Sequence, residues 1–146
     1  MTGTPEMRSA SPGDGAAAPS PDEVRLTMPA SPDMLRVARL AAAGLAGQMG
    51  LTFDQIEDVK IAIDELCFAL VRGRTGGDLT LTFRLGSDLE IEGVGNFDGS
   101  AAESSTAGLD LGLSELSALI LGAVVDEHEL AHDGERTRFR LLKRRD

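Results

Sequence analysis

The amino-acid sequence predicts an α+β fold, a two-layer sandwich in which three helices cover one face of a mainly antiparallel sheet. Its periodicity gives the order strand, helix, helix, hairpin, helix, hairpin, and such runs favour this class over a strict alternation of strands and helices. The chain has 146 residues, of which 42% are hydrophobic. This length and composition suit one domain around one core, which we place at residues 23–143.

Two tails are expected to flank this domain, at residues 1–22 and 144–146. The first 22 residues are mostly Pro, Gly, Ala and Ser, with almost no large apolar side chain. Burial therefore cannot offset the entropy cost of ordering them, and we predict a disordered N-terminal tail.

The first strand and the first helix follow directly. Residues 24–28 alternate between apolar and polar side chains, which predicts a half-buried strand. Ser31 and Pro32 suit the cap and first position of a helix. Arg36 and Arg39 lie opposite its apolar stripe, so we expect them to face solvent. The predicted buried stripe consists of Met34, Val37, Ala38, Ala41, Leu45 and Met49.

The second helix is expected to begin at Thr52, which forms a capping-box pair with Gln55, and to end near Gly73. Its second half is apolar nearly all round except for two adjacent acids, Asp64 and Glu65. The predicted core stripe consists of Ile56, Val59, Ile63, Leu66, Cys67 and Leu70. The predicted far side carries Ile61, Ala62, Phe68 and Ala69.

A hairpin is expected next, because residues 79–85 and 89–92 alternate around a Gly-Ser-Asp turn. Residues 95–110 are rich in Gly, Ser and Ala and predict a long mobile loop. A third helix is expected over 111–125. The last hairpin is predicted over 125–141 with its turn at 132–135, and the basic ending of the chain is interpreted as the solvated side of an edge strand.

This last hairpin contains HELAH, His128 to His132, which matches the H-E-x-x-H pattern of zinc metalloproteases. On a helix, histidines four residues apart could share an ion, whereas on a strand they lie roughly 13 Å apart. The periodicity predicts a strand, and a third ligand could come only from Glu135 or Asp146. We therefore expect surface histidines and no zinc.

Composition narrows the function classes further. The formal net charge of -10 argues against direct binding of nucleic acid or of an anionic membrane. The single cysteine, Cys67, cannot form an internal disulfide, and the sequence has neither an apolar run of about 18 residues nor a signal-peptide core. We expect a cytoplasmic protein.

The second helix also resembles a known family. The stretch QIEDVKIAIDELCFALV, residues 55–71, is similar to the nucleotide-binding helix of the anti-sigma factor serine kinases, which have the histidine-kinase-like ATPase (Bergerat, GHKL) fold. Residues 32–48 resemble the first helix of that family, and residues 111–130 its glycine-led third helix and following strand. The D-E-[LV]-C form of the helix resembles divergent actinobacterial members. The resemblance covers roughly residues 23–143.

The resemblance implies ATP and magnesium as cofactors, with Glu65 as the general base toward a protein hydroxyl. One turn later the family has an asparagine that ligates magnesium, where this chain has Ala69. An alanine offers no oxygen to a cation that demands oxygen ligands. This departure argues against magnesium binding.

Two further departures concern the nucleotide. In the family's D-x-G motif the aspartate accepts a hydrogen bond from adenine; here Gly95 keeps the glycine, but Gly93 replaces the aspartate. The glycine-rich segment that would wrap the phosphates is reduced to Gly108 and to Gly112 with Leu113. These departures argue against ATP binding. Glycines at strand ends or bulges are a commoner use of Gly93 and Gly95, and Glu65 could equally be an exposed helix residue.

The resemblance further implies two protein partners, a sigma factor and an anti-anti-sigma factor, and a homodimer. In the family, an exposed arginine of the first helix pairs with acidic groups of the sigma factor, and Arg39 falls at that position with Arg36 beside it. A guanidinium suits bidentate pairing with a carboxylate. An ordinary solvent-facing arginine is the alternative.

We therefore expect an anti-sigma factor that sequesters an alternative sigma factor and has a degenerate kinase site. An active ATP-dependent serine kinase that phosphorylates the anti-anti-sigma factor is the second hypothesis. A zinc hydrolase built on HELAH is the third.

Overall fold

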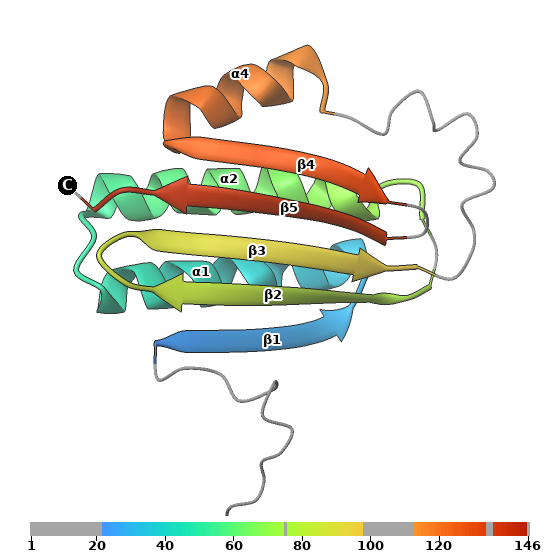
Figure 1. Ribbon diagram of the computed structural model, residues 1–146, viewed down its shortest axis with the longest axis horizontal. Coiled ribbons are helices and arrows are strands. Elements are labelled where there is room, and N and C mark those ends of the chain that lie inside the picture. The colour runs from blue at the N-terminus through green and yellow to red at the C-terminus, as the bar shows by residue number, and fades with distance from the viewer. Residues whose placement is uncertain (1–21, 75, 98–112, 134–135, 146) are drawn as a thin grey trace, which may run out of the picture.

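The structure is a computed structural model and describes residues 22–74, 76–97, 113–133 and 136–145. Figure 1 shows the arrangement of its elements. In chain order these are β1 (Glu23–Pro29), the 3-10 turn η3 (Pro32–Met34), α1 (Leu35–Gln48), α2 (Phe53–Val71), β2 (Asp78–Leu85), β3 (Leu89–Asn96), α4 (Glu115–Val124), β4 (Glu127–Asp133) and β5 (Arg136–Lys143).

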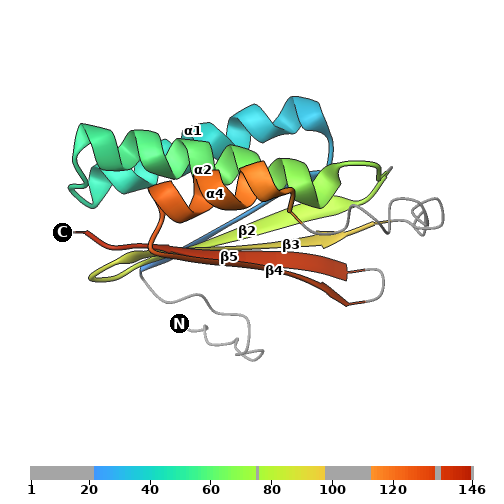
Figure 2. The same cartoon turned by 90° about the horizontal axis from the view of Figure 1, so that it is seen from above.

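The described elements form two layers. The strands make a five-stranded sheet in the order β1-β2-β3-β5-β4, and all neighbours are antiparallel. The three helices lie together on one face of this sheet, with α2 between α1 and α4 (Figure 2). The predicted two-layer α+β class is confirmed.

The hydrophobic core lies between the layers. Alternate strand residues face the helices, so that Phe83, Ile91 and Phe139 are fully buried while their neighbours point to the open face of the sheet. The antiparallel register sets Phe83 opposite Ile91 and Gly93 opposite Phe139. Large side chains from four strands thereby fill one continuous core.

The buried stripe of α1 differs from the predicted one. Its buried residues are Ala38, Ala42 and Ala46, whereas Val37 is 37% exposed. Helical spacing places Val37 and Ala38 on one stripe, and the prediction was right for Ala38 and wrong for Val37. The other predicted stripe residues are partly buried and pack against the core: Met34, Ala41, Leu45 and Met49. Small side chains at every fourth position instead let α1 pack closely on α2. Ala62 of α2, expected on the far side, is also fully buried.

The predicted loop over 95–110 begins too early. Gly95 and Asn96 belong to β3, where they pair with β2 on one side and with β5 on the other. Residues 98–112, which hold the rest of that loop, lie outside the described residues. The third helix begins at Glu115, after the N-cap Ser114, whose side chain accepts a hydrogen bond from the Ser117 amide at 2.9 Å.

The basic ending is not the edge strand that the sequence analysis expected. β5 lies between β3 and β4, and β4 forms the edge. Arg140 of β5 donates to Glu90 of β3 at 2.7 Å and to Glu127 of β4 at 3.3 Å. An interior strand can offer an arginine to acids on both neighbours, as Arg140 does here.

The predicted tails fall mostly beyond the described chain, since residues 1–21 lie outside it. At the C-terminus, the backbone amides of Arg144 and Arg145 donate to Asp126 at 2.6 Å and to Asp88 at 3.2 Å. Within the described chain, every helix is too short or too polar to cross a bilayer.

Candidate functional site

The candidate site is built on α2, the helix at the centre of its layer. A capping box begins this helix: the Gln55 amide donates to Thr52 Oγ1 at 3.1 Å, and the Thr52 amide donates to Gln55 Oε1 at 2.8 Å. Further along the helix, the two adjacent acids Asp64 and Glu65 lie beside the buried stripe, and both are half-buried.

The two acids contact different neighbouring helices. Asp64 Oδ1 accepts a hydrogen bond from Arg39 Nε of α1 at 3.1 Å. Glu65 Oε1 accepts one from Ser117 Oγ of α4 at 2.7 Å. Adjacent helix positions point about 100° apart, which lets one residue pair face both neighbours. The acids therefore join all three helices at the outer surface of the layer.

A surface hollow of about 370 Å³ lies beside these acids. Its apolar lining comes from Pro32, Leu35 and Phe68, and its polar lining from Arg39, Asp64 and Glu65. This size is within the range of sites that take one large side chain or a small molecule. The structure thus brings together Glu65 and Arg39, which the sequence analysis selected for two different roles. Arg36, the second predicted partner residue, is exposed on α1.

Neighbouring side chains fill the space beside the positions that were expected to bind nucleotide. Gly93 lies opposite Phe139 on the neighbouring strand, and a Cβ atom at Gly93 would come within 2.4 Å of the Phe139 ring. The family's aspartate could not be accommodated here unless Phe139 moved. Ala69, where the family has its magnesium ligand, is half-buried on α2 and carries no oxygen on its side chain.

An aromatic ring also packs directly against Gly95. A Cβ atom there would lie 2.6 Å from the ring of Phe97. The guanidinium of Arg74 lies 4.9 Å from the centre of that ring, within cation-π distance. Of the remaining predicted positions, Gly112 lies outside the described residues, and Leu113 is partly buried against the hydrophobic core.

A buried polar residue next to this cluster was missed by the sequence analysis. The side chain of Thr137 in β5 is fully buried, and its hydroxyl lies 3.1 Å from Arg74 Nη2 and 3.3 Å from His132 Nδ1. A buried hydroxyl needs such partners because it has lost its water. The signal was present in the sequence, since Thr137 falls on the apolar phase of an alternating strand.

The histidines of HELAH lie on β4, as the periodicity predicted. Four residues along a strand separate their Cα atoms by roughly 13 Å, which is too far to share one zinc ion. No group of three His, Cys, Asp or Glu side chains suited to a metal ion occurs within the described ranges. The strand geometry argues against the zinc hydrolase hypothesis.

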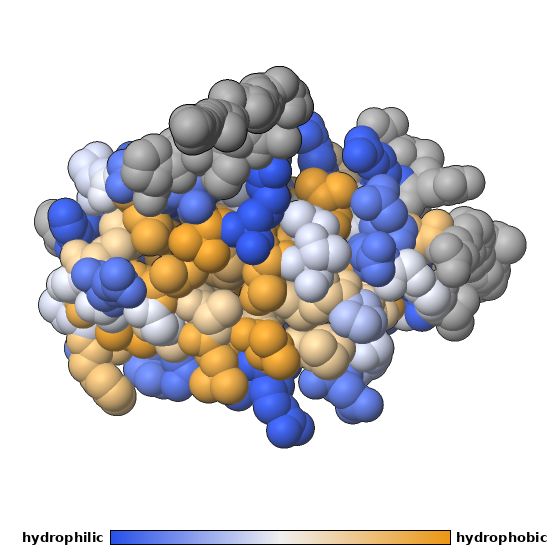
Figure 3. All heavy atoms as spheres, turned by 90° about the horizontal axis from the view of Figure 1, so that it is seen from below, coloured by the Kyte–Doolittle hydropathy of each residue, from blue (hydrophilic) through white to orange (hydrophobic). Residues whose placement is uncertain are grey.

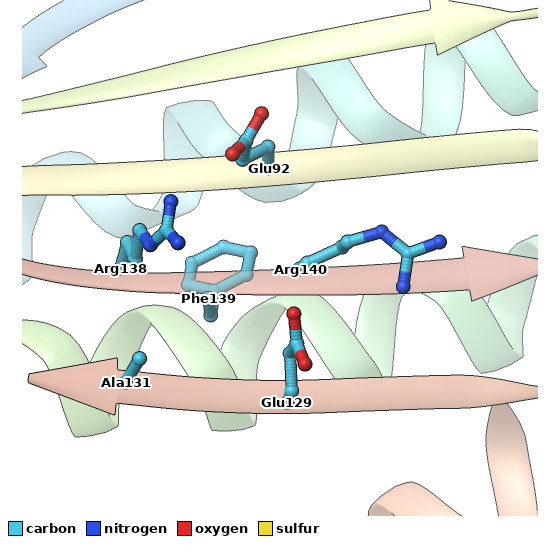
Figure 4. Close-up of a pocket in the computed structure, with 6 residues that line it drawn as sticks. All are labelled: Glu92, Glu129, Ala131, Arg138, Phe139 and Arg140. Carbon is cyan, nitrogen blue, oxygen red and sulfur yellow. The ribbon is translucent and has the colours of Figure 1, made fainter.

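A second hollow lies on the open face of the sheet (Figure 4). Its volume is about 140 Å³, and its lining consists of Glu92, Glu129, Ala131, Arg138, Phe139 and Arg140. The hydrogen bonds from Arg140 to Glu90 and Glu127 raise the pKa of its guanidinium. Because ligand pockets usually exceed roughly 300 Å³, this charged hollow does not suit a nucleotide.

Cys67 lies one turn beyond Asp64 on the buried side of α2. Burial raises the pKa of its thiol well above the ordinary value, and the nearby carboxylate of Asp64 raises it further. A thiol that stays protonated is a poor nucleophile and a poor metal ligand. Cys67 is therefore part of the core, in agreement with its predicted position on the buried stripe.

Comparison with known proteins identifies relatives. The serine-protein kinase RsbW of Bacillus cereus (strain G9842) is 32% identical over 126 residues, which cover 77% of this chain and 79% of that protein. The RsbW of Halalkalibacterium halodurans is 30% identical over 131 residues, which cover 77% and 78%. No protein-family model matches the chain.

A solved structure has a similar fold. It is the crystal structure of the RsbU and RsbW domains of a Mycobacterium tuberculosis protein, with a TM-score of 0.61 and 18% identity. The match covers 87% of this chain and 33% of that longer one. At this level of identity, the likeness concerns the fold alone.

The layered fold and the helix that carries Glu65 define a domain of the histidine-kinase-like ATPase class. Within this class, the chain belongs to the RsbW serine-protein kinase family, on the strength of relatives at 30% identity or more over most of both chains. The family that the second helix resembles, the anti-sigma factor serine kinases, is thereby confirmed.

Proposed function

We propose that this chain is an anti-sigma factor that binds and sequesters an alternative sigma factor, and that an anti-anti-sigma factor releases it by competing for the chain. The observation that carries the proposal is the position of Arg39. The Arg39 side chain is 39% exposed and lines a hollow that opens to the surface. A guanidinium there can reach a carboxylate on a partner protein.

The surface around Arg39 supports a protein partner. The outer side of α1 carries the exposed apolar side chains Val37 and Leu40 next to Arg36, and Leu40 is 63% exposed. The buried core of an interface is more apolar than the rest of the surface, and arginine is enriched at interfaces. We propose that Arg36 and Arg39 pair with acidic groups of the sigma factor.

The nucleotide site is proposed to be degenerate. The relatives are named serine-protein kinases, and the family resemblance implies ATP as the phosphoryl donor. In this chain the ring of Phe139 lies where a side chain at Gly93 would be, and Ala69 offers no ligand to magnesium. The residues present do not fit ATP and magnesium as the resemblance arranges them, and we therefore place no catalytic step at Glu65.

The enzyme alternative is an active kinase that phosphorylates the anti-anti-sigma factor with Glu65 as its base. The family name favours it, whereas the packing at Gly93 argues against it. We place the chain in the cytoplasm, where RNA polymerase and its sigma factors act.

We further propose that the chain forms a homodimer through the edge of the sheet at β1. Among the described strands, β1 pairs with β2 alone. Beside it lies an apolar hollow of about 390 Å³ whose lining includes Val24, Leu26, Ala41, Leu45 and Phe83. Figure 3 views the molecule from the side on which β1 lies in Figure 1, and apolar residues gather on that face. An open strand edge next to an apolar surface suits symmetric pairing with a second copy.

Sedimentation velocity tests the dimer. Val24→Glu places a charge on this surface, and we expect it to convert dimers into monomers. Leu119→Glu is the control, since Leu119 is also exposed but lies on α4. A wild-type monomer, or an equal response to both substitutions, would contradict this interface.

Transcription in vitro tests the function. The chain is added to RNA polymerase that carries the sigma factor retained by the tagged protein from a native lysate. We expect it to suppress transcription from promoters of that sigma factor and to leave transcription with another sigma factor unchanged. Equal transcription with and without the chain would refute the proposal.

A further inference from the structure

Arg39 is already paired within the chain. Its Nε donates to Asp64 Oδ1 at 3.1 Å, across the boundary between α1 and α2, and the two side chains are 39% and 45% exposed. Within the described part of the chain, this is the hydrogen bond that the Arg39 side chain makes, and it uses only one side of the guanidinium fork. The side chain is 39% exposed, so a partner can approach the remaining donors from solvent.

The proposed function assigns the same guanidinium to a carboxylate of a partner. Two carboxylates would then compete for one cation. A partner carboxylate that binds both sides of the fork makes two charge-assisted hydrogen bonds, whereas Asp64 makes one. Asp64 is nearly half exposed, so water can solvate it after displacement, and no charge is left buried. Exchange of one acid for the other is therefore physically accessible.

We propose that Asp64 is an internal competitor for Arg39, which occupies the guanidinium in the free chain and lowers its affinity for an acidic partner segment. This inference rests on the proposed function, because it takes Arg39 as a partner contact. The segment that fits has a carboxylate for Arg39 and an adjacent apolar side chain for the hollow formed by Pro32, Leu35 and Phe68.

The charges around Arg39 indicate that Asp64 competes with an acidic partner segment and does not help it to bind. Glu65 lies next to Asp64 and also lines the hollow, so this surface presents two acids to one arginine. An incoming acidic segment is repelled by both acids and attracted by Arg39. Neutralising Asp64 removes one repulsion and releases the guanidinium at the same time.

The test compares Asp64→Asn with a matched control, Glu57→Gln. Glu57 lies on the same helix, is 41% exposed, and forms its own ion pair with Lys60 at 3.1 Å. Both substitutions remove one negative charge and one exposed ion pair. We expect Asp64→Asn to bind the sigma factor with a Kd about two- to fivefold lower than that of wild type. This range corresponds to the free energy that an exposed ion pair typically contributes. Glu57→Gln is expected to bind like wild type.

Equal affinity of the two variants would overturn the inference. Weaker binding by Asp64→Asn would also overturn it, since it would mean that Asp64 holds Arg39 in place for the partner. Arg39→Ala separates this inference from the proposed function. If Arg39→Ala binds as wild type does, the proposed contact itself fails. If Arg39→Ala loses binding and Asp64→Asn gains none, only the competition fails.

A measurement on the free chain needs no partner. In the nitrogen-15 spectrum, the Nε–H group of Arg39 should exchange with water more slowly than that of Arg36, and Asp64→Asn should abolish the difference. Equal exchange of the two arginines in the wild-type chain would show that Asp64 does not hold Arg39, and the inference would fail whichever partner binds.

Discussion

Ser117 Oγ donates a hydrogen bond of 2.7 Å to Glu65 Oε1, which joins the first turn of α4 to the middle of α2. The carboxylate that the family resemblance makes a general base is thus already bound to a serine hydroxyl of the same chain. Ser117 is itself positioned by the capping residue Ser114. This contact holds α4 against the helix that carries the candidate site.

Ser117→Ala should lower the free energy of unfolding by about 1 kcal/mol. A hydrogen bond to a charged group contributes somewhat more when buried, and both side chains here are only half-buried. Urea denaturation measures the change. Ser87→Ala, in the exposed turn between β2 and β3, is the control and should change stability little.

A double-mutant cycle isolates the contact itself. With Glu65→Ala present, the further change Ser117→Ala should cost clearly less than it does alone. Additive effects of the two substitutions would mean that the hydrogen bond contributes nothing to stability.

Gly93→Ala should destabilise the fold by about 1–3 kcal/mol, because the new methyl group must displace a packed aromatic ring. The ring is that of Phe139, which would lie 2.4 Å from the added carbon. Gly122→Ala is the control: it has open space around its Cβ and should stabilise α4 slightly. Combining Gly93→Ala with Phe139→Leu should cost less than the sum of the two. Thermal or urea unfolding of the four variants decides this, and a neutral Gly93→Ala would contradict the packing described here.

Cys67 should not react with a thiol reagent in the folded chain. Its thiol is fully buried, and its raised pKa keeps it protonated at mildly alkaline pH, where an ordinary exposed thiol is partly thiolate. The release of thionitrobenzoate from Ellman's reagent measures this reaction. We expect one equivalent in denaturant and almost none in native buffer. Rapid stoichiometric reaction of the folded chain would contradict the buried position.

ATP should show no saturable, magnesium-dependent binding to the wild-type chain. Calorimetric titration with and without magnesium measures this directly. A relative that keeps the asparagine and aspartate of the family's motifs serves as the positive control. Tight binding that requires magnesium would reverse the order of the two leading hypotheses and favour the active kinase.

Much of the fold could be predicted because the apolar periodicity is strong. The alternation in β2 and the capping box at Thr52 each follow from local chemistry, and the structure contains both. The stripe of α1 could not be predicted in the same way. Helical spacing places Val37 on the same stripe as Ala38, but the face that is buried carries Ala38, Ala42 and Ala46. Which face is covered depends on α2, a neighbour in space that local periodicity does not specify.

The candidate site was predictable only in part. The sequence indicates Glu65 and Arg39 separately, yet the hollow that both line depends on how α1 packs on α2. The pairing of Asp64 with Arg39 joins residues 25 positions apart, and no local pattern encodes it. The contact of Phe139 with Gly93 likewise depends on the register of two strands that are distant in sequence.

The most direct test of the central claim is a pull-down from a native lysate that compares wild type, Arg39→Glu and Arg84→Glu. Arg84 is the matched control, because it lies on the open face of β2, is 44% exposed, and pairs with Glu92 of β3 at 3.2 Å. We predict that wild type and Arg84→Glu retain the same sigma factor, identified by mass, and that Arg39→Glu loses it. Retention of no sigma factor by any form, or equal retention by all three, would contradict the anti-sigma account in which α1 makes the contact.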